Sequence, residues 1–164
     1  MRKVLKFPKI SRQINKSSCG ANALKSIIKY YLGENVSEKE LCKIAKTTKK
    51  EGTSVPNLIR AAKKFKLKYL SKHNLTIKDL KNSIDREIPV VVLVQEWADR
   101  KISDWSGVWE FGHYVTVVGY DRDKIIFYDP FNGKKRFLSY KDFSERWHDK
   151  DNKIKYNHFG IFFG

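Results

Sequence analysis

Cys19 is the residue whose type and position most directly suggest chemistry. It stands in the stretch SRQINKSSCGANAL, where Cys19 and Gly20 lie at the expected start of a helix. Backbone N–H groups and the helix dipole at such a start favour an anion, which lowers the pKa of a thiol and yields a nucleophilic thiolate. Gly20 would let a substrate carbonyl approach the backbone, and Gln13 could donate its amide to a developing oxyanion. Taken alone, Cys19 is more simply explained as a buried thiol.

A cysteine nucleophile also needs a base, and the base needs an orienting group. His113 is the best placed of the four histidines, because it follows Gly112 and opens an expected strand. Asp129 ends the next expected strand, directly before Pro130. A hairpin of these two strands brings both side chains to the same end of a sheet. The structural alternatives are a hydrogen-bonded core histidine and an aspartate that forms a turn with Pro130.

The register of that hairpin decides whether the two side chains can meet. With a two-residue turn, Asp129 pairs opposite Thr116 and its side chain leaves on the face opposite to His113. With a three-residue loop, 121–123, Asp129 pairs opposite Val115 and lies diagonal to His113 on the same face, within side-chain reach. A pair of His113 and Asp129 therefore requires an odd-numbered loop or a bulge.

The elements that must position these residues are helices first and antiparallel strands later, which predicts an α+β fold. Apolar residues at helical spacing predict a helix that starts at Cys19, with Ser17 or Ser18 as its cap, and ends at Gly33. Further helices are predicted to start at Ser37, Val55, Thr76 and Ser139, and strands are predicted at 67–70, 88–95, 113–120, 124–130, 133–140 and 158–164. We expect a single domain, 1–164, with a helical half at about 13–86 and a sheet half at about 88–163.

Composition limits the class of protein. The chain has 164 residues, 41% hydrophobic and 13% aromatic, which excludes a disordered protein. No apolar stretch is long enough to span a bilayer, and the start MRKVLKFPKI lacks the features of a signal peptide. Cys19 and Cys42 are the two cysteines. Without an export signal, we expect reduced thiols in a cytoplasmic protein rather than a disulfide, with Cys42 packed inside its helix.

The net charge of +16 comes from 34 basic and 18 acidic residues. Such a charge attracts nucleic acid, anionic lipid or acidic peptides. The basic residues are spread over the solvated faces of the expected helices, and neither a phosphate-binding glycine loop nor an RNA-binding aromatic motif is present. Nucleic acid binding is therefore the weaker hypothesis, and the expected partner is a peptide or protein substrate. The oligomeric state is left open.

The order of these motifs resembles a known family. Gln13, Cys19-Gly20, Gly112–Val115 and Tyr128–Pro130 are similar to the C39 peptidases, papain-like cysteine proteases best known as N-terminal domains of bacterial peptide exporters. There they remove leader peptides after a double glycine. The stretches 30–65 and 133–147 are similar to the family's helical half and to the strand and helix after its aspartate. The resemblance extends from about Gln13 to Phe162.

This resemblance implies a papain-like fold, with an N-terminal helical half packed on a C-terminal antiparallel sheet. It implies that Cys19 is the nucleophile, His113 the general base and acid, and Asp129 the orienting group. Gln13 and the backbone N–H of Cys19 would form the oxyanion hole. The implied reaction is hydrolysis of a peptide bond through an acyl-enzyme, without a cofactor or metal, and the implied task is leader-peptide or bacteriocin processing after small residues. The alternative is a papain-like module that binds a peptide without cleaving it.

The segment 96–111 looks longer than in the transporter-linked members and resembles the stand-alone C39-like branch. A free-standing enzyme and a domain excised from a larger protein stay open as alternatives, and so does the double-glycine preference. The segment holds three tryptophans and more acidic than basic residues. One hypothesis is a lid or wall in which Trp105, Trp109 and Gly112 contact an extended peptide. The other is that these tryptophans fill a gap over the sheet.

Overall fold

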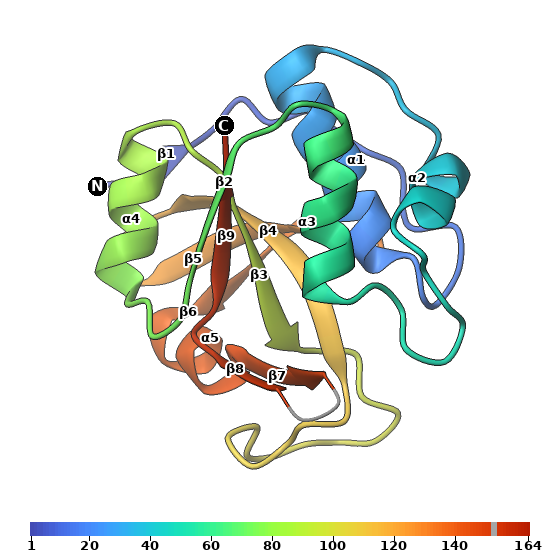
Figure 1. Cartoon of the computed structure of the whole chain (residues 1–164). Coiled ribbons are helices and arrows are strands. Elements are labelled where there is room, and N and C mark those ends of the chain that lie inside the picture. Colours follow the sequence, from blue (N-terminus) through green and yellow to red (C-terminus); the bar gives the residue numbers. More distant parts are fainter. Residues whose placement is uncertain (152–153) are drawn as a thin grey trace.

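The computed structural model describes residues 1–151 and 154–164 and shows a central antiparallel sheet flanked by helices (Figure 1). The helices are α1 (Cys19–Leu32), α2 (Glu38–Ile44), α3 (Val55–Lys64), α4 (Ile77–Asp85) and α5 (Tyr140–Arg146). The strands are β1 (Lys3–Val4), β2 (Tyr69–Lys72), β3 (Val90–Gln95), β4 (Gly112–Tyr120), β5 (Lys124–Asp129), β6 (Lys134–Ser139), β7 (His148–Asp151), β8 (Ile154–Asn157) and β9 (Gly160–Phe163). The predicted α+β class is confirmed.

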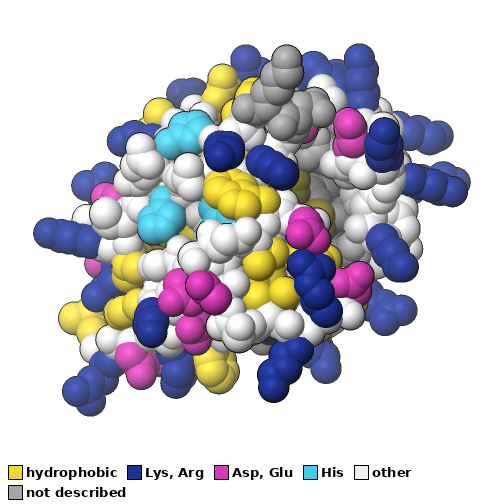
Figure 2. Space-filling view, turned by 90° about the horizontal axis from the view of Figure 1, so that it is seen from below, with side chains coloured by type: hydrophobic (Ala, Val, Ile, Leu, Met, Phe, Trp, Pro, Cys, Tyr) yellow, Lys and Arg dark blue, Asp and Glu magenta, His cyan; other side chains and the backbone are white. Residues whose placement is uncertain are grey.

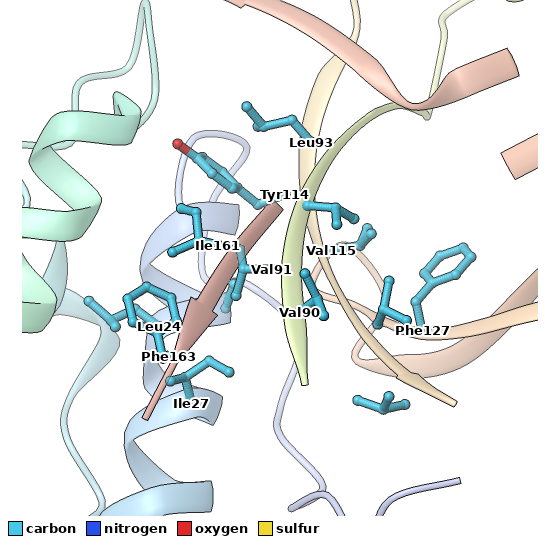
Figure 3. Packing of buried hydrophobic residues seen from close by; sticks show 14 of the residues in the cluster. Leu24, Ile27, Val90, Val91, Leu93, Tyr114, Val115, Phe127, Ile161 and Phe163 are labelled. Atoms are coloured by element: carbon cyan, nitrogen blue, oxygen red, sulfur yellow. The ribbon is translucent and has the colours of Figure 1, made fainter. Parts of the chain in front are cut away.

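The main sheet has the order β2-β9-β3-β4-β5-β6, and β1 pairs with β4 beside β3. All six residues of β3 are buried, as its continuous apolar sequence predicts for a central strand. α1 packs on this sheet, where its Leu24 and Ile27 lie near Val91, Ile161 and Phe163 (Figure 3). This packing places the first turn of α1 against β4.

Most predicted elements form near their expected bounds. α1 begins at Cys19 and ends at Gly33, which has a positive φ of 69°. Ser18 is the residue before the helix, but its hydroxyl donates to the Asn15 carbonyl (3.1 Å) instead of capping the helix. The strand β1 and the separate antiparallel pair of β7 and β8 were not predicted. They are short and largely polar, and they lack the apolar alternation by which a strand is recognised.

The β4–β5 hairpin contains a bulge that sets the register of the site. Next to the turn, Tyr120 pairs with Ile125, so an even number of residues separates the two strands. That register alone would direct Asp129 away from His113. The pairing shifts at Val118, which leaves this residue unpaired and moves the remainder of the hairpin by one position. His113 and Asp129 therefore share one face, and the bulge rather than an odd-numbered loop fulfils the condition.

The N-terminal segment supports this bulge. The Leu5 N–H donates to the Val118 carbonyl (2.8 Å), and Lys3 pairs with Tyr120. A Cβ on Gly119 would lie 2.7 Å from the Lys3 carbonyl oxygen, so the close approach of β1 requires glycine at this position. In the described part of the chain, no helix combines the length and apolar character needed to cross a bilayer.

Candidate active site

Cys19 is the first residue of α1 and lies half-buried in a cavity of about 580 Å³ that His113 also lines. Two contacts fix its position. The turn before the helix is closed by the Asn15 N–H, which donates to the Ser18 hydroxyl (3.2 Å). Gly20 packs so closely on β4 that a Cβ there would lie 3.1 Å from the Tyr114 ring. Gly20 thus has a packing role; it is buried and is not among the described residues of the cavity lining, so the substrate approach expected from the sequence stays a prediction.

The environment of Cys19 favours its thiolate. Burial alone would raise the pKa of the thiol, but a hydrogen bond with His113, the charge of that ring and the backbone N–H groups of Tyr114 and Gly20 lower it below the ordinary value. Cys42 is also a free thiol, and burial raises its pKa. The pKa is thus lowered at Cys19, as expected for a nucleophile, and raised at Cys42, as expected for a packed thiol.

His113 and Asp129 form a short buried hydrogen bond. The His113 Nε2 lies 2.6 Å from Asp129 Oδ1, with the two residues 7% and 0% exposed. Because Nε2 is engaged, Nδ1 is the ring nitrogen left for the thiol of Cys19. Burial would lower the pKa of His113, but the hydrogen bonds to Asp129 and Cys19 raise it to about 10. These contacts favour an imidazolium next to a thiolate.

Asp129 is held by three donors besides His113. The Phe131 N–H donates to Oδ1 (2.9 Å), while the Trp97 indole N–H and the Arg136 guanidinium each donate to Oδ2 at 2.8 Å. Burial would raise the pKa of Asp129, yet the hydrogen bond and charge of His113, with the Phe131 N–H and Arg136, lower it. The carboxylate therefore stays ionised and fixed in direction, as an orienting group must be.

Arg136 links Asp129 to a second buried carboxylate. Its Nη1 also donates to Glu96 Oε2 (3.0 Å), and Glu96 Oε1 forms an ion pair with Arg146 (3.2 Å). Sequence reasoning assigned no role to Arg136 or Arg146. Arg136 lies on β6 two residues after Lys134, which pairs with Asp129. The proximity of Arg136 to Asp129 can be inferred only once the β5–β6 register is known.

Trp97 covers the Asp129 carboxylate. Its ring stacks on Phe131 with 4.2 Å between centroids, and the Arg136 guanidinium lies 4.8 Å from its centroid. Trp97 has a φ of 58°, a strained backbone conformation for a bulky residue. The indole hydrogen bond to Asp129 helps to compensate that strain. Trp97 was part of the tryptophan-rich segment in the sequence, but its contact with Asp129 was not predicted.

The other predicted contact residues separate in the structure. Trp109 and Gly112 line the cavity with Cys19 and His113. Trp105 instead lies against Arg146, whose guanidinium is 4.1 Å from the ring centroid, and it is not among the described residues of the cavity lining. The three tryptophans of 96–111 thus have different surroundings, and a lid function for the segment stays a prediction.

Gln13 is buried next to the turn that leads to Cys19. Its Nε2 donates to the Asn15 carbonyl (2.8 Å), and its backbone N–H donates to the Pro130 carbonyl (2.7 Å). Its Oε1 has no hydrogen-bond partner among residues 1–151 and 154–164. The amide has one remaining N–H hydrogen, so a role at an oxyanion stays open, although Gln13 is not among the described residues of the cavity lining.

The fold matches that of the Carica candamarcensis cysteine protease CMS1MS2, which is 14% identical with a TM-score of 0.60 and coverage of 96% of this chain and 92% of that chain, and the predicted papain-like fold is confirmed. The profile of the Peptidase C39 family matches residues 8–151. The chain belongs to the Peptidase C39 family and is a cysteine-type peptidase by class. This membership confirms the resemblance noted from the sequence motifs.

Individual relatives agree with this assignment. The pediocin PA-1 transport/processing ATP-binding protein PedD of Pediococcus acidilactici is 28% identical over 139 residues, which cover 82% of this chain and 17% of PedD. The peptidase domain of Streptococcus ComA, a bi-functional ABC transporter of a quorum-sensing pathway, is 26% identical with a TM-score of 0.72, covering 95% of this chain and 97% of that domain. A double glycine motif protease from an AMS/PCAT transporter, solved in complex with the leader peptide, shares the fold at 17% identity, with a TM-score of 0.69 and coverage of 98% and 93%.

Proposed function

We propose that this protein hydrolyses a peptide bond with Cys19 as nucleophile, His113 as general acid and base, and Asp129 as the orienting group. The observation that carries the proposal is the 2.6 Å hydrogen bond between His113 and Asp129 at the wall of the cavity that contains the Cys19 thiol. The lowered pKa of Cys19 and the raised pKa of His113 support it, because both favour the reactive ion pair.

In the first step, the Cys19 thiolate attacks the carbonyl carbon of the scissile bond, and a C–S bond forms. The resulting oxyanion accepts hydrogen bonds from the Cys19 backbone N–H and, in this proposal, from Gln13. His113 then transfers its proton to the leaving amine as the C–N bond breaks. In the second step, His113 takes a proton from water, the hydroxide attacks the thioester, and the C–S bond breaks to release the acid and restore the thiolate.

We further propose a peptide substrate that is cleaved after small residues, as in leader-peptide processing. PedD carries processing in its name, and a neighbour in the structural comparison holds a leader peptide. Gly112 lines the cavity beside His113 and has no side chain of its own that would exclude an extended substrate backbone. A reducing, cytoplasmic setting completes the proposal, since both thiols are free.

The test is alkylation with iodoacetamide near neutral pH, with the modified cysteine mapped by mass spectrometry. We expect rapid modification of Cys19, slow modification of Cys42, and a strongly reduced Cys19 rate in His113→Ala. Cys42 serves as the internal control, because its pKa is raised rather than lowered. Equal rates for the two cysteines, or no effect of His113→Ala, would refute an activated pair.

Cleavage is then tested on a synthetic double-glycine leader peptide, with Cys19→Ala as the inactive control. Specific cleavage that depends on Cys19 supports the peptidase. Tight binding of the peptide by the wild-type protein without cleavage would instead support a peptide-binding module. No observation beyond the net charge favours nucleic acid as a ligand.

A further inference from the structure

Asp149 is a carboxylate in the cavity that the proposed reaction does not use. It lies on β7 opposite Tyr156 of β8, and both residues line the cavity together with Cys19 and His113. The carboxylate lies directly over Gly112, because a Cβ at that position would be 2.2 Å from Asp149 Oδ2 and 2.3 Å from Oδ1. Glycine before His113 therefore makes room for an acidic group beside the reacting residues.

The structure fixes this carboxylate from one side only. Asp149 Oδ1 accepts hydrogen bonds from the Lys150 N–H (2.8 Å) and from Gln95 Nε2 (3.3 Å). Gln95 is fully buried, and its amide is itself held by the His148 carbonyl (3.1 Å) and the Phe111 N–H (2.8 Å). Within residues 1–151 and 154–164, Oδ2 accepts no hydrogen bond and Asp149 forms no salt bridge. One acceptor atom is thus held in place by a buried amide while the other stays available.

The charge around Asp149 differs from that of the molecule as a whole. The chain carries a net charge of +16, whereas the described lining of this cavity is balanced between acidic residues and lysines. The acidic residues are Glu51, Glu110, Asp149 and Asp151, and the lysines are Lys16, Lys49, Lys50 and Lys150. Figure 2 shows acidic, histidine and hydrophobic side chains intermixed with Lys and Arg near the middle of the face seen from below, while Lys and Arg predominate around its rim. Burial and the nearby Asp151 raise the pKa of Asp149 to about 6, with the His113 charge acting in the opposite direction. A half-buried carboxylate of this kind is stabilised by a cation.

We propose that Asp149 is a specificity-determining residue that binds the basic side chain of a lysine or arginine in the peptide substrate, close to the scissile bond. This inference rests on the proposed peptidase function. The apolar stem of such a side chain can lie along the partly exposed ring of Trp109, which lines the same cavity. Its charged end then donates to the available Oδ2 of Asp149 in a charge-assisted hydrogen bond.

The experiment uses peptide vinyl sulfones that alkylate the active-site thiol. Each carries glycine next to the electrophile and lysine, norleucine or glutamate at one of the two preceding positions. The rate of Cys19 modification is followed by intact mass. Because charge-assisted hydrogen bonds are the strong ones, we expect lysine to be favoured over norleucine by about tenfold or more at one position.

Three variants assign the preference to one residue. In Asp149→Asn the ratio of lysine to norleucine rates should fall to near one, and in Asp149→Lys glutamate should become the favoured residue. Asp151→Asn removes a charge from the same wall and should retain most of the preference. Each ratio is measured on one protein preparation, so an unfolded fraction lowers both rates equally and leaves the ratio unchanged.

Iodoacetamide separates failure of this inference from failure of the proposed function. If iodoacetamide modifies Cys19 rapidly while the lysine and norleucine peptides react at equal rates at both positions, the basic subsite is wrong and the peptidase stands. The basic subsite is equally wrong if Asp149→Asn keeps the wild-type ratio. If iodoacetamide also reacts slowly, the activated thiol is refuted, and the subsite with it.

Discussion

Replacing Arg136 by methionine tests whether the buried charges behind the active site depend on one another. Arg136 Nη1 donates to Asp129 (2.8 Å) and to Glu96 (3.0 Å), whose side chains are 0% and 2% exposed. Methionine keeps an apolar stem beside Trp97 but leaves both carboxylates without this cation. Loss of one partner from a buried ion pair costs about 3–5 kcal/mol.

The expected cost for Arg136→Met is smaller than that range. Arg136 is 26% exposed, so water can reach part of the gap, and Asp129 keeps three other donors. Glu96 also keeps its ion pair with Arg146 (3.2 Å). We therefore expect the free energy of unfolding to fall by about 2–3 kcal/mol near neutral pH.

The cost should depend on pH, because Asp129 has a lowered pKa in the folded protein. Its ionised form stabilises the fold above the unfolded pKa, and this contribution is lost as pH falls through the lower, folded pKa. Removal of Arg136 raises the folded pKa. The penalty is therefore complete near neutral pH, and it shrinks only when the pH falls below the folded pKa of Asp129 in the variant.

The assay is urea denaturation followed by tryptophan fluorescence at pH 7 and at successively lower pH values, down to the acid unfolding of the wild type. Arg100→Met is the matched control, because Arg100 and Glu110 form an ion pair at 3.3 Å with side chains 51% and 64% exposed. An exposed pair of this kind contributes about 0–1 kcal/mol. The reasoning fails if Arg136→Met costs no more than Arg100→Met at pH 7, or if its penalty grows as the pH is lowered.

Three further predictions concern the thiol, the bulge and the tryptophan-rich segment. Alkylation of Cys19 should persist well below pH 9, because its thiol has a lowered pKa. In His113→Ala, the effect of burial on the thiol pKa should dominate, and the curve of alkylation rate against pH should move to higher pH. Gly119→Ala places a Cβ 2.7 Å from a carbonyl oxygen, so denaturation should show a loss of about 1–3 kcal/mol, and Cys19 alkylation should slow as the hairpin shifts. Trp109→Ala should raise KM for a leader peptide with little change in stability, because Trp109 lines the cavity. Trp105→Ala should mainly lower stability, because Trp105 packs against Arg146. The opposite pattern would contradict these placements.

Much of the fold follows from local sequence patterns. The α1 helix, the central β3 strand and the β4–β5 hairpin are predicted by apolar periodicity, helix ends and turn residues. The candidate Cys19, His113 and Asp129 were found in the same way, because each lies at the end of a predictable element. Trp97 and Arg136 could not be found, since their role depends on which strand or loop packs beside Asp129.

The sequence by itself determined the residue types at the site, their order along the chain and the class of fold. It also determined the condition under which His113 and Asp129 can meet, because side chains alternate between the two faces of a strand. Only the tertiary structure decided how that condition is fulfilled. The bulge at Val118 is held by a hydrogen bond from Leu5, in a segment more than a hundred residues away. Periodicity within one hairpin carries no information about such a distant partner, so the register that closes the site is a property of the folded chain.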